Sequence, residues 1–201
     1  MKRFATLALA AVALTFSTLT ASAQPVTWNV DNSHSSVHFK VRHFLTTVTG
    51  QFNDFEGTIV FDEKNPAALS VVASVRCSTV FTDHERRDGH LRSADFFDVE
   101  KFPTITFKST KAEAVGKNKF KITGDFTMRG VTKVVTFDGE FMGAGTFGSA
   151  DRSMTKAGFS ASAVIQRKDY GMVWNRTFDQ GGVMLGEDVT ISIEVEADKA
   201  K

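Results

Sequence analysis

Apolar and polar residues alternate along most of the chain with a period of two. The alternation recurs in eight segments, at residues 37–42, 55–62, 71–78, 104–108, 119–126, 135–141, 159–166 and 189–196. Because successive side chains of a strand leave it on opposite faces, each segment has one apolar and one polar face. Antiparallel sheets with one solvated face have this pattern, whereas parallel strands are usually apolar on both faces. The pattern predicts an all-β protein of about eight antiparallel strands.

Several connections between these segments carry turn signals. Four of them stand out: Asn65-Pro66, Gly116-Lys117-Asn118, Arg129-Gly130 and Gly143-Ala144-Gly145. Short connections favour the pairing of strands that follow one another in the sequence. Such strands can close into an extended up-and-down barrel with the apolar face inside, or stack as a two-sheet sandwich. Periodicity alone does not separate these two architectures.

One stretch, near residues 83–97, departs from the alternation. Thr82 and Glu85 have the spacing of a capping box, which satisfies free N–H groups at a helix start. Asp88 and Arg92 are four residues apart and can pair on one helix face. We therefore expect one short helix inserted among the strands, where it could cover a barrel mouth.

The first 23 residues have the features of a secretory signal peptide. A basic start precedes an apolar run without charges, and Ala21-Ser22-Ala23 fits the small-residue rule for cleavage between Ala23 and Gln24. The alternative is an uncleaved anchor, but the run is short for a membrane span of about 20 residues. We expect a periplasmic protein whose residues 24–201 form a single domain.

Composition narrows the possible functions. The chain has 24 Lys plus Arg against 23 Asp plus Glu, so a formal charge of +1 gives no field for gathering nucleic acid. Its single cysteine cannot form an intrachain disulfide. A membrane barrel would need girdles of Tyr and Trp, and the chain has only Trp28, Tyr170 and Trp174. We expect no nucleic-acid partner and no stable membrane insertion.

The 19 phenylalanines give the best indication of a binding site. Phenylalanine supplies apolar bulk without the polar group of Tyr or Trp. Residues two apart in a strand share a face, and this strand parity places one set of apolar side chains inside the barrel. Some of them would line a cavity and others fill a closed end: Phe39, Val41, Phe61, Phe107, Phe126, Phe137 and Phe159. His43 shares the parity of Phe39 and Val41. It is either a satisfied core histidine or a polar group that orients a ligand.

The sequence offers little catalytic or metal-binding chemistry. It has no Gly-x-Ser-x-Gly, phosphate-binding loop, dinucleotide fingerprint or Cys-x-x-Cys. His84 and His90 are six residues apart, a poor spacing for one helical face, and Arg86 and Arg87 between them would repel a cation. We expect no metal and no cofactor.

Several of these motifs together resemble the YceI-like family. The most specific is the block from Arg87 to Asp98, with the sequence RDGHLRSADFFD. The others are His34-Ser35, Arg42-His43, Gly50-x-Phe52, Phe102 to Phe107, Gly124 to Thr127, Gly130 to Lys133, Gly158 to Ala161, Arg167-x-x-Tyr170-Gly171 and Leu185-Gly186. The resemblance covers essentially all of residues 26–197.

The resemblance implies a lipocalin-like antiparallel barrel in the periplasm. Its long apolar channel would bind a polyisoprenoid, such as a prenyl phosphate or a quinone-type lipid, or another long-chain lipid or amide. The family has no established enzymatic activity, so we expect a binding or carrier protein. The alternatives are a hydrolase or isomerase that acts on such a lipid with His43 or His90 as base, and a structural interaction module with an incidental cavity.

The polar end of such a ligand needs partners that an apolar channel does not supply. Candidate residues at the barrel rim are His43, Arg87, Asp88, His90 and Arg167. Alternatively, Arg87 and Asp88 form an ion pair that fastens the helix to the barrel. The sequence leaves the oligomeric state open between a monomer and a homodimer.

Overall fold

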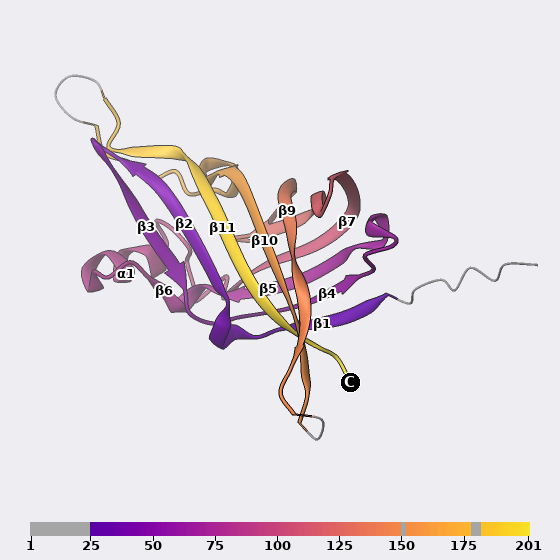
Figure 1. Ribbon diagram of the computed structural model, residues 1–201. Coiled ribbons are helices and arrows are strands. Elements are labelled where there is room, and N and C mark those ends of the chain that lie inside the picture. The colour runs from indigo at the N-terminus through magenta and orange to yellow at the C-terminus, as the bar shows by residue number, and fades with distance from the viewer. Residues whose placement is uncertain (1–24, 150–151, 178–181) are drawn as a thin grey trace, which may run out of the picture.

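The structure, a computed structural model, describes residues 25–149, 152–177 and 182–201 (Figure 1). The expected signal peptide and its cleavage site at Ala23 and Gln24 lie outside these residues. Among the described residues, none of the helices combines the length and hydropathy of a membrane span. The strands and the α-helix are β1 (Val26–Val30), β2 (Ser36–His43), β3 (Thr46–Phe52), β4 (Phe55–Phe61), β5 (Ser70–Arg76), β6 (Val80–Phe81), α1 (Glu85–Arg92), β7 (Thr104–Gly116), β8 (Lys119–Met128), β9 (Val131–Phe147), β10 (Met154–Gln166) and β11 (Leu185–Lys199).

Eight of the strands form a closed antiparallel barrel, as predicted. The ring runs β1-β4-β5-β7-β8-β9-β10-β11, and β11 pairs with β1 to close it. The closing register places Trp28 opposite Lys199. From β7 to β11 each strand pairs with the next in the sequence. Short turns join β7, β8, β9 and β10, whereas residues 167–184 separate β10 from β11. The barrel, and not the sandwich, is therefore the architecture of this chain.

The strand β11 is long enough to pair with two strands along one of its edges, while β10 pairs along the other. Residues 185–194 pair with β2, and residues 197–199 pair with β1. The β2–β3 hairpin therefore leaves the ring beside β11 and carries the short strand β6 at its edge. Figure 1 shows this hairpin extending to the upper left. Residues of this hairpin and of α1 line a cavity at this end of the barrel.

The helix near residues 83–97 exists but is shorter than predicted, since α1 covers only Glu85–Arg92. His84, and not Thr82, caps it: the His84 Nδ1 atom accepts a hydrogen bond from the Arg87 amide at 3.3 Å. The helix ends because Ser93 turns to an extended conformation and its hydroxyl bonds the His90 carbonyl at 2.8 Å.

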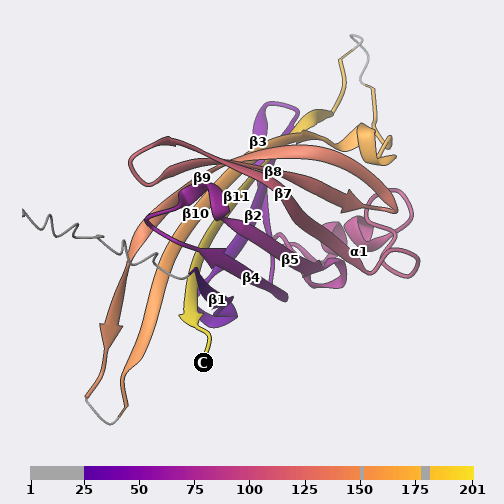
Figure 2. The same ribbon diagram turned by 90° about the vertical axis from the view of Figure 1, so that its right-hand side faces the viewer.

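The opposite end of the barrel is closed by packed aromatic rings. The ring of Phe61 lies 4.8 Å from that of Phe141, 5.5 Å from that of Phe120 and 5.9 Å from that of Phe159. All four side chains are buried. Edge-to-face and tilted contacts at these distances are favourable because ring edges and faces carry opposite partial charges. Beyond this end, β9 and β10 continue as a long ribbon, at the bottom of Figures 1 and 2.

Candidate functional site

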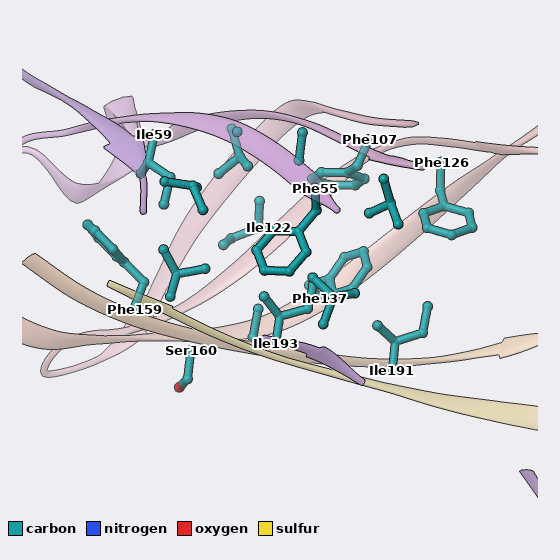
Figure 3. Close-up of a pocket in the computed structure, with 18 of the residues that line it drawn as sticks. Phe55, Ile59, Phe107, Ile122, Phe126, Phe137, Phe159, Ser160, Ile191 and Ile193 are labelled. Atoms are coloured by element: carbon teal, nitrogen blue, oxygen red, sulfur yellow. The ribbon is translucent and has the colours of Figure 1, made fainter. Parts of the chain in front are cut away.

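An apolar cavity, here called the inner cavity, occupies the middle of the barrel. Its volume is about 160 Å³. Figure 3 shows phenylalanine and isoleucine side chains from strands around the ring pointing toward one another, while the hydroxyl of Ser160 points away. An apolar cavity of roughly 150 Å³ stays dry and can hold a benzene-sized group. The inner cavity is thus suited to part of a hydrocarbon chain.

Most of the predicted inward phenylalanines lie around this cavity. Its lining includes Phe39, Phe107, Phe126, Phe137 and Phe159. Phe61 is not among the lining residues, because it belongs to the closed end of the barrel. The two roles that sequence parity could not separate, lining and filling, are thus distributed along the length of the barrel.

A second cavity, here called the outer cavity, lies at the open end and has a volume of about 500 Å³. Residues from β2, α1, β11 and the segment after the 3-10 helix Arg167–Tyr170 line it. The two cavities share five lining residues: Phe39, Phe52, Ile105, Phe126 and Ile191. The cavities therefore meet end to end, and these side chains stand at the junction.

The Phe39 ring reaches the junction because a glycine lies opposite it. Phe39 pairs with Gly50 of β3, and a Cβ atom on Gly50 would come within 2.3 Å of the ring. Any larger residue at this position would displace the ring. The Gly50-x-Phe52 motif thus has a packing role, because it leaves room for Phe39 and supplies Phe52 to the same junction.

The charged and polar side chains that line the outer cavity are all basic. Apart from apolar residues, the described lining consists only of arginine and histidine: His43, His84, Arg86, Arg87, His90, Arg167 and Arg176. No carboxylate, hydroxyl or thiol side chain is among these lining residues. The outer cavity therefore favours an anionic or hydrogen-bond-accepting group, and its described lining offers histidine bases without a hydroxyl, thiol or carboxylate nucleophile.

Of the predicted head-group residues, His43 and Arg87 line the outer cavity, but Asp88 does not. The Asp88 carboxylate is buried under α1, where it accepts bonds from the Thr82 amide at 2.9 Å and the Thr82 hydroxyl at 2.5 Å. Arg87 donates to the same Thr82 through Nε and Nη2. Thr82 thus links the two residues in place of a direct ion pair, and the network fastens α1 to the end of β6.

His90 lies in the outer cavity with its ring held on three sides. Its Nε2 atom is 2.8 Å from a carboxylate oxygen of Asp95. The rings of Phe96 and Trp174 each meet it edge to face at 4.9 Å. A histidine oriented by a carboxylate can act as a base, but here the contacts also pack α1 against the segment 172–177.

Arg167 lines the same cavity but is almost completely buried, at 2% exposure. Its guanidinium donates to the backbone carbonyls of Gly186 at 2.7 Å, Trp174 at 2.9 Å and Leu185 at 3.3 Å, and to that of Met172. Burial is the main cause that lowers the pKa of Arg167 from its usual value. Arg167 therefore holds two backbone segments together at the rim of the cavity.

Sequence reasoning did not assign Trp174, Arg176, Arg86 and His84 to the binding site. Trp174 and Arg176 lie in a stretch without alternation, so nothing in their spacing signals that they reach the outer cavity. Arg86 and His84 were considered only as parts of a weak metal motif. All four line the cavity because α1 and the segment 172–177 fold over the same opening.

A separate ionic cluster fastens the other end of the sheet. The Nζ atom of Lys156 lies 2.8 Å from Asp31, 2.7 Å from Glu196 and 3.2 Å from Asp198, and His34 bonds Asp31 at 2.7 Å. Hydrogen bonds from Lys156 and His34 hold the pKa of Asp31 well below its usual range. Lys156 thus occupies the place that a cation would take between these carboxylates.

The chain was compared with known proteins. Residues 28–197 match the YceI-like domain. A UPF0312 protein of Enterobacter sp. (strain 638) is 38% identical over 189 residues, which are 94% of each chain. The crystal structure of the YCEI protein of Campylobacter jejuni has a TM-score of 0.66 and 31% identity, and covers 86% of this chain and 97% of its own.

A polyisoprenoid binding domain from Saccharophagus degradans shares the fold, with a TM-score of 0.62 and 14% identity over 87% of this chain and 99% of its own. At that identity, the likeness concerns the fold alone. The family match, in contrast, spans nearly the whole barrel, and relatives with well over 30% identity match it end to end. The chain therefore belongs to the YceI-like family.

Proposed function

We propose that this protein is a periplasmic binding or carrier protein for a polyisoprenoid or another long-chain lipid or amide. The observation that carries the proposal is the pair of cavities meeting end to end, one apolar and one lined by arginine and histidine. The tail would occupy the inner cavity and the polar end the outer one. The polyisoprenoid binding domain with the same fold supports this ligand class, and the expected signal peptide supports the location.

Burial of the tail supplies the affinity. Each methylene transferred from water contributes about 0.8 kcal/mol, so partial burial of a long chain already gives tight binding. The rings at the junction of the cavities have no hydrogen-bond donors that a hydrocarbon would leave unsatisfied. The inner cavity would therefore select for apolar character and shape.

The outer cavity would select the head group. Arg87 uses two of its five N–H groups on Thr82, and its side chain lines the cavity. Because no acidic side chain is among the described lining residues, a phosphate or pyrophosphate would meet only cationic or neutral partners. Among the long-chain ligands considered, this lining favours a prenyl phosphate over a neutral quinone-type lipid or amide.

A bulky residue in the inner cavity should block the tail. Ala73 of β5 lines the cavity, whereas its neighbour Val72 points outward and is 55% exposed. We expect Ala73→Phe to weaken the binding of a fluorescent prenyl alcohol at least about tenfold, because it fills space that a few methylenes would occupy. The matched variant Val72→Phe should bind like wild type. Equal affinities in a fluorescence titration of the two variants would place the tail elsewhere.

The head-group assignment predicts a difference between charged and uncharged ligands. We expect Arg87→Gln to weaken the binding of a prenyl phosphate by about 1.5–3 kcal/mol, the contribution of a hydrogen bond to a charged group. Binding of the matching prenyl alcohol should be unchanged, which also shows that the variant is folded. Arg76→Gln, which lies outside both cavities, is the matched control. If all three proteins bind both ligands equally, Arg87 does not contact the head group.

A further inference from the structure

Large apolar side chains are exposed at the rim of the outer cavity. Phe44 and Leu45 form the turn between β2 and β3 and are 47% and 77% exposed, and Val183 is 55% exposed. The Phe44 amide donates to the Met184 carbonyl at 2.6 Å, so the turn and the segment entering β11 lie side by side. We call Phe44, Leu45 and Val183 the rim cluster. The turn between β2 and β3 lies at the upper left of Figure 1.

The composition of this turn is unfavourable for a soluble hairpin. Two-residue turns favour Asn-Gly or similar pairs, because the backbone there takes positive φ angles. Phe44 adopts a φ of 51°, in the left-handed region that a bulky side chain rarely occupies. The chain thus leaves two large apolar residues partly exposed, one of them in a strained conformation. Such a combination is typical of functional surfaces.

Two arginines lie beside the rim cluster, and the nearest described carboxylate after Gly186, that of Glu187, pairs with Lys168. The Arg42 side chain donates to the Phe44 carbonyl at 2.9 Å, and the Arg176 guanidinium lies 5.8 Å from the centre of the Trp174 ring. The described residues 42–47, 172–177 and 182–186 include these two arginines and no carboxylate. Residues 178–181 lie outside the described part of the chain. Apolar residues flanked by arginine, with a tryptophan beside them, suit the interface of an anionic bilayer.

We propose that the rim cluster docks on an anionic lipid bilayer, with the mouth of the outer cavity facing the membrane. The inference rests on the proposed function, because docking of this kind serves the transfer of a lipid between bilayer and barrel. A tail that crosses water exposes every methylene, whereas a docked mouth lets it pass from one apolar environment to another. Charge complementarity favours the bilayer over a second copy, which would bring two arginine-bearing rims together.

The test is cosedimentation with vesicles of phosphatidylcholine and phosphatidylglycerol, without added ligand. Wild type should bind, and binding should weaken with added salt and on vesicles of phosphatidylcholine alone. The double variant Leu45→Ser, Val183→Ser should bind at least tenfold more weakly. Val115→Ser is the matched control, since Val115 is also 55% exposed but lies at the end of β7 near the closed end. It should bind like wild type.

Three outcomes would overturn the proposal. In the first, wild type does not bind anionic vesicles. In the second, the double variant binds them as strongly as wild type. In the third, mutation of the rim cluster changes only self-association, measured by analytical ultracentrifugation. Titration of a soluble fluorescent prenyl phosphate separates this proposal from the proposed function. The double variant should keep its ligand affinity while losing vesicle binding. If wild type binds vesicles but no lipid ligand, docking stands and the lipid-carrier function fails.

Discussion

Replacing Phe61 by alanine is expected to lower the free energy of unfolding by about 3–5 kcal/mol. Phe61 is 4% exposed and its ring contacts three other phenylalanine rings at the closed end of the barrel. The substitution would remove these contacts and leave a void that rigid neighbours cannot fill. Urea unfolding followed by intrinsic fluorescence would measure the loss, with Trp28 opposite Ile59 as a nearby reporter.

Phe107→Ala is the matched control for this prediction. Phe107 is only partly buried, lines the inner cavity and makes one close ring contact, with Phe137 at 5.1 Å. Because part of its surface already faces empty space, its truncation should cost clearly less than that of Phe61. If Phe107→Ala were the more destabilising of the two, the division into a lining set and a filling set would be wrong.

The second large effect is expected at Arg167. Replacing it with methionine should lower the free energy of unfolding by about 3 kcal/mol or more. The variant would keep much of the side-chain volume but leave the carbonyls of Gly186, Trp174 and Met172 without the donor that now binds them. An unsatisfied buried acceptor costs about 1–3 kcal/mol. The Leu185 carbonyl would lose less, because Asn175 also donates to it.

Two measurements distinguish this role from a general effect of losing charge. Arg76→Met removes an exposed arginine that pairs with Asp54, and it should change stability by no more than about 1 kcal/mol. Hydrogen exchange should show faster opening of residues 172–177 in the Arg167 variant, since the guanidinium joins them to β11. Unchanged exchange there would contradict the assignment of Arg167 as the residue that holds the rim.

The architecture could be predicted because seven of the eight ring strands, all but β1, obey a local rule. Strands such as β11 alternate apolar and polar residues over much of their length, here from Val189 to Asp198, so one face must be buried. The strands β1, β3 and β6 were not predicted. β6 has only two residues, and β3 carries threonines and a glycine where a regular apolar face would stand. β1 and β6 pair with strands far away in the sequence, which periodicity does not reveal, and β3 pairs with its neighbour β2.

The site could be predicted only in part, for the same reason. Parity placed the Phe39 and His43 side chains inward, and both line a cavity. It could not show that Asp88 turns under α1 to bind Thr82, or that Arg167 bonds carbonyls rather than facing solvent. Hydrogen bonds of this kind depend on which segments meet in space. The sequence motif identified the residues, and their roles follow from the tertiary contacts.

The pairing that closes the ring also constrains the order of folding. The hairpins from β7 to β11 join neighbours and can form as soon as each strand is present. The seam between β1 and β11 instead joins Trp28 to Lys199, nearly the whole chain apart. Contacts of such separation form late, because a long loop must close first. Until the last residues of the chain pair with it, β1 keeps an open sheet edge, which makes the unfinished barrel a natural target for chaperones.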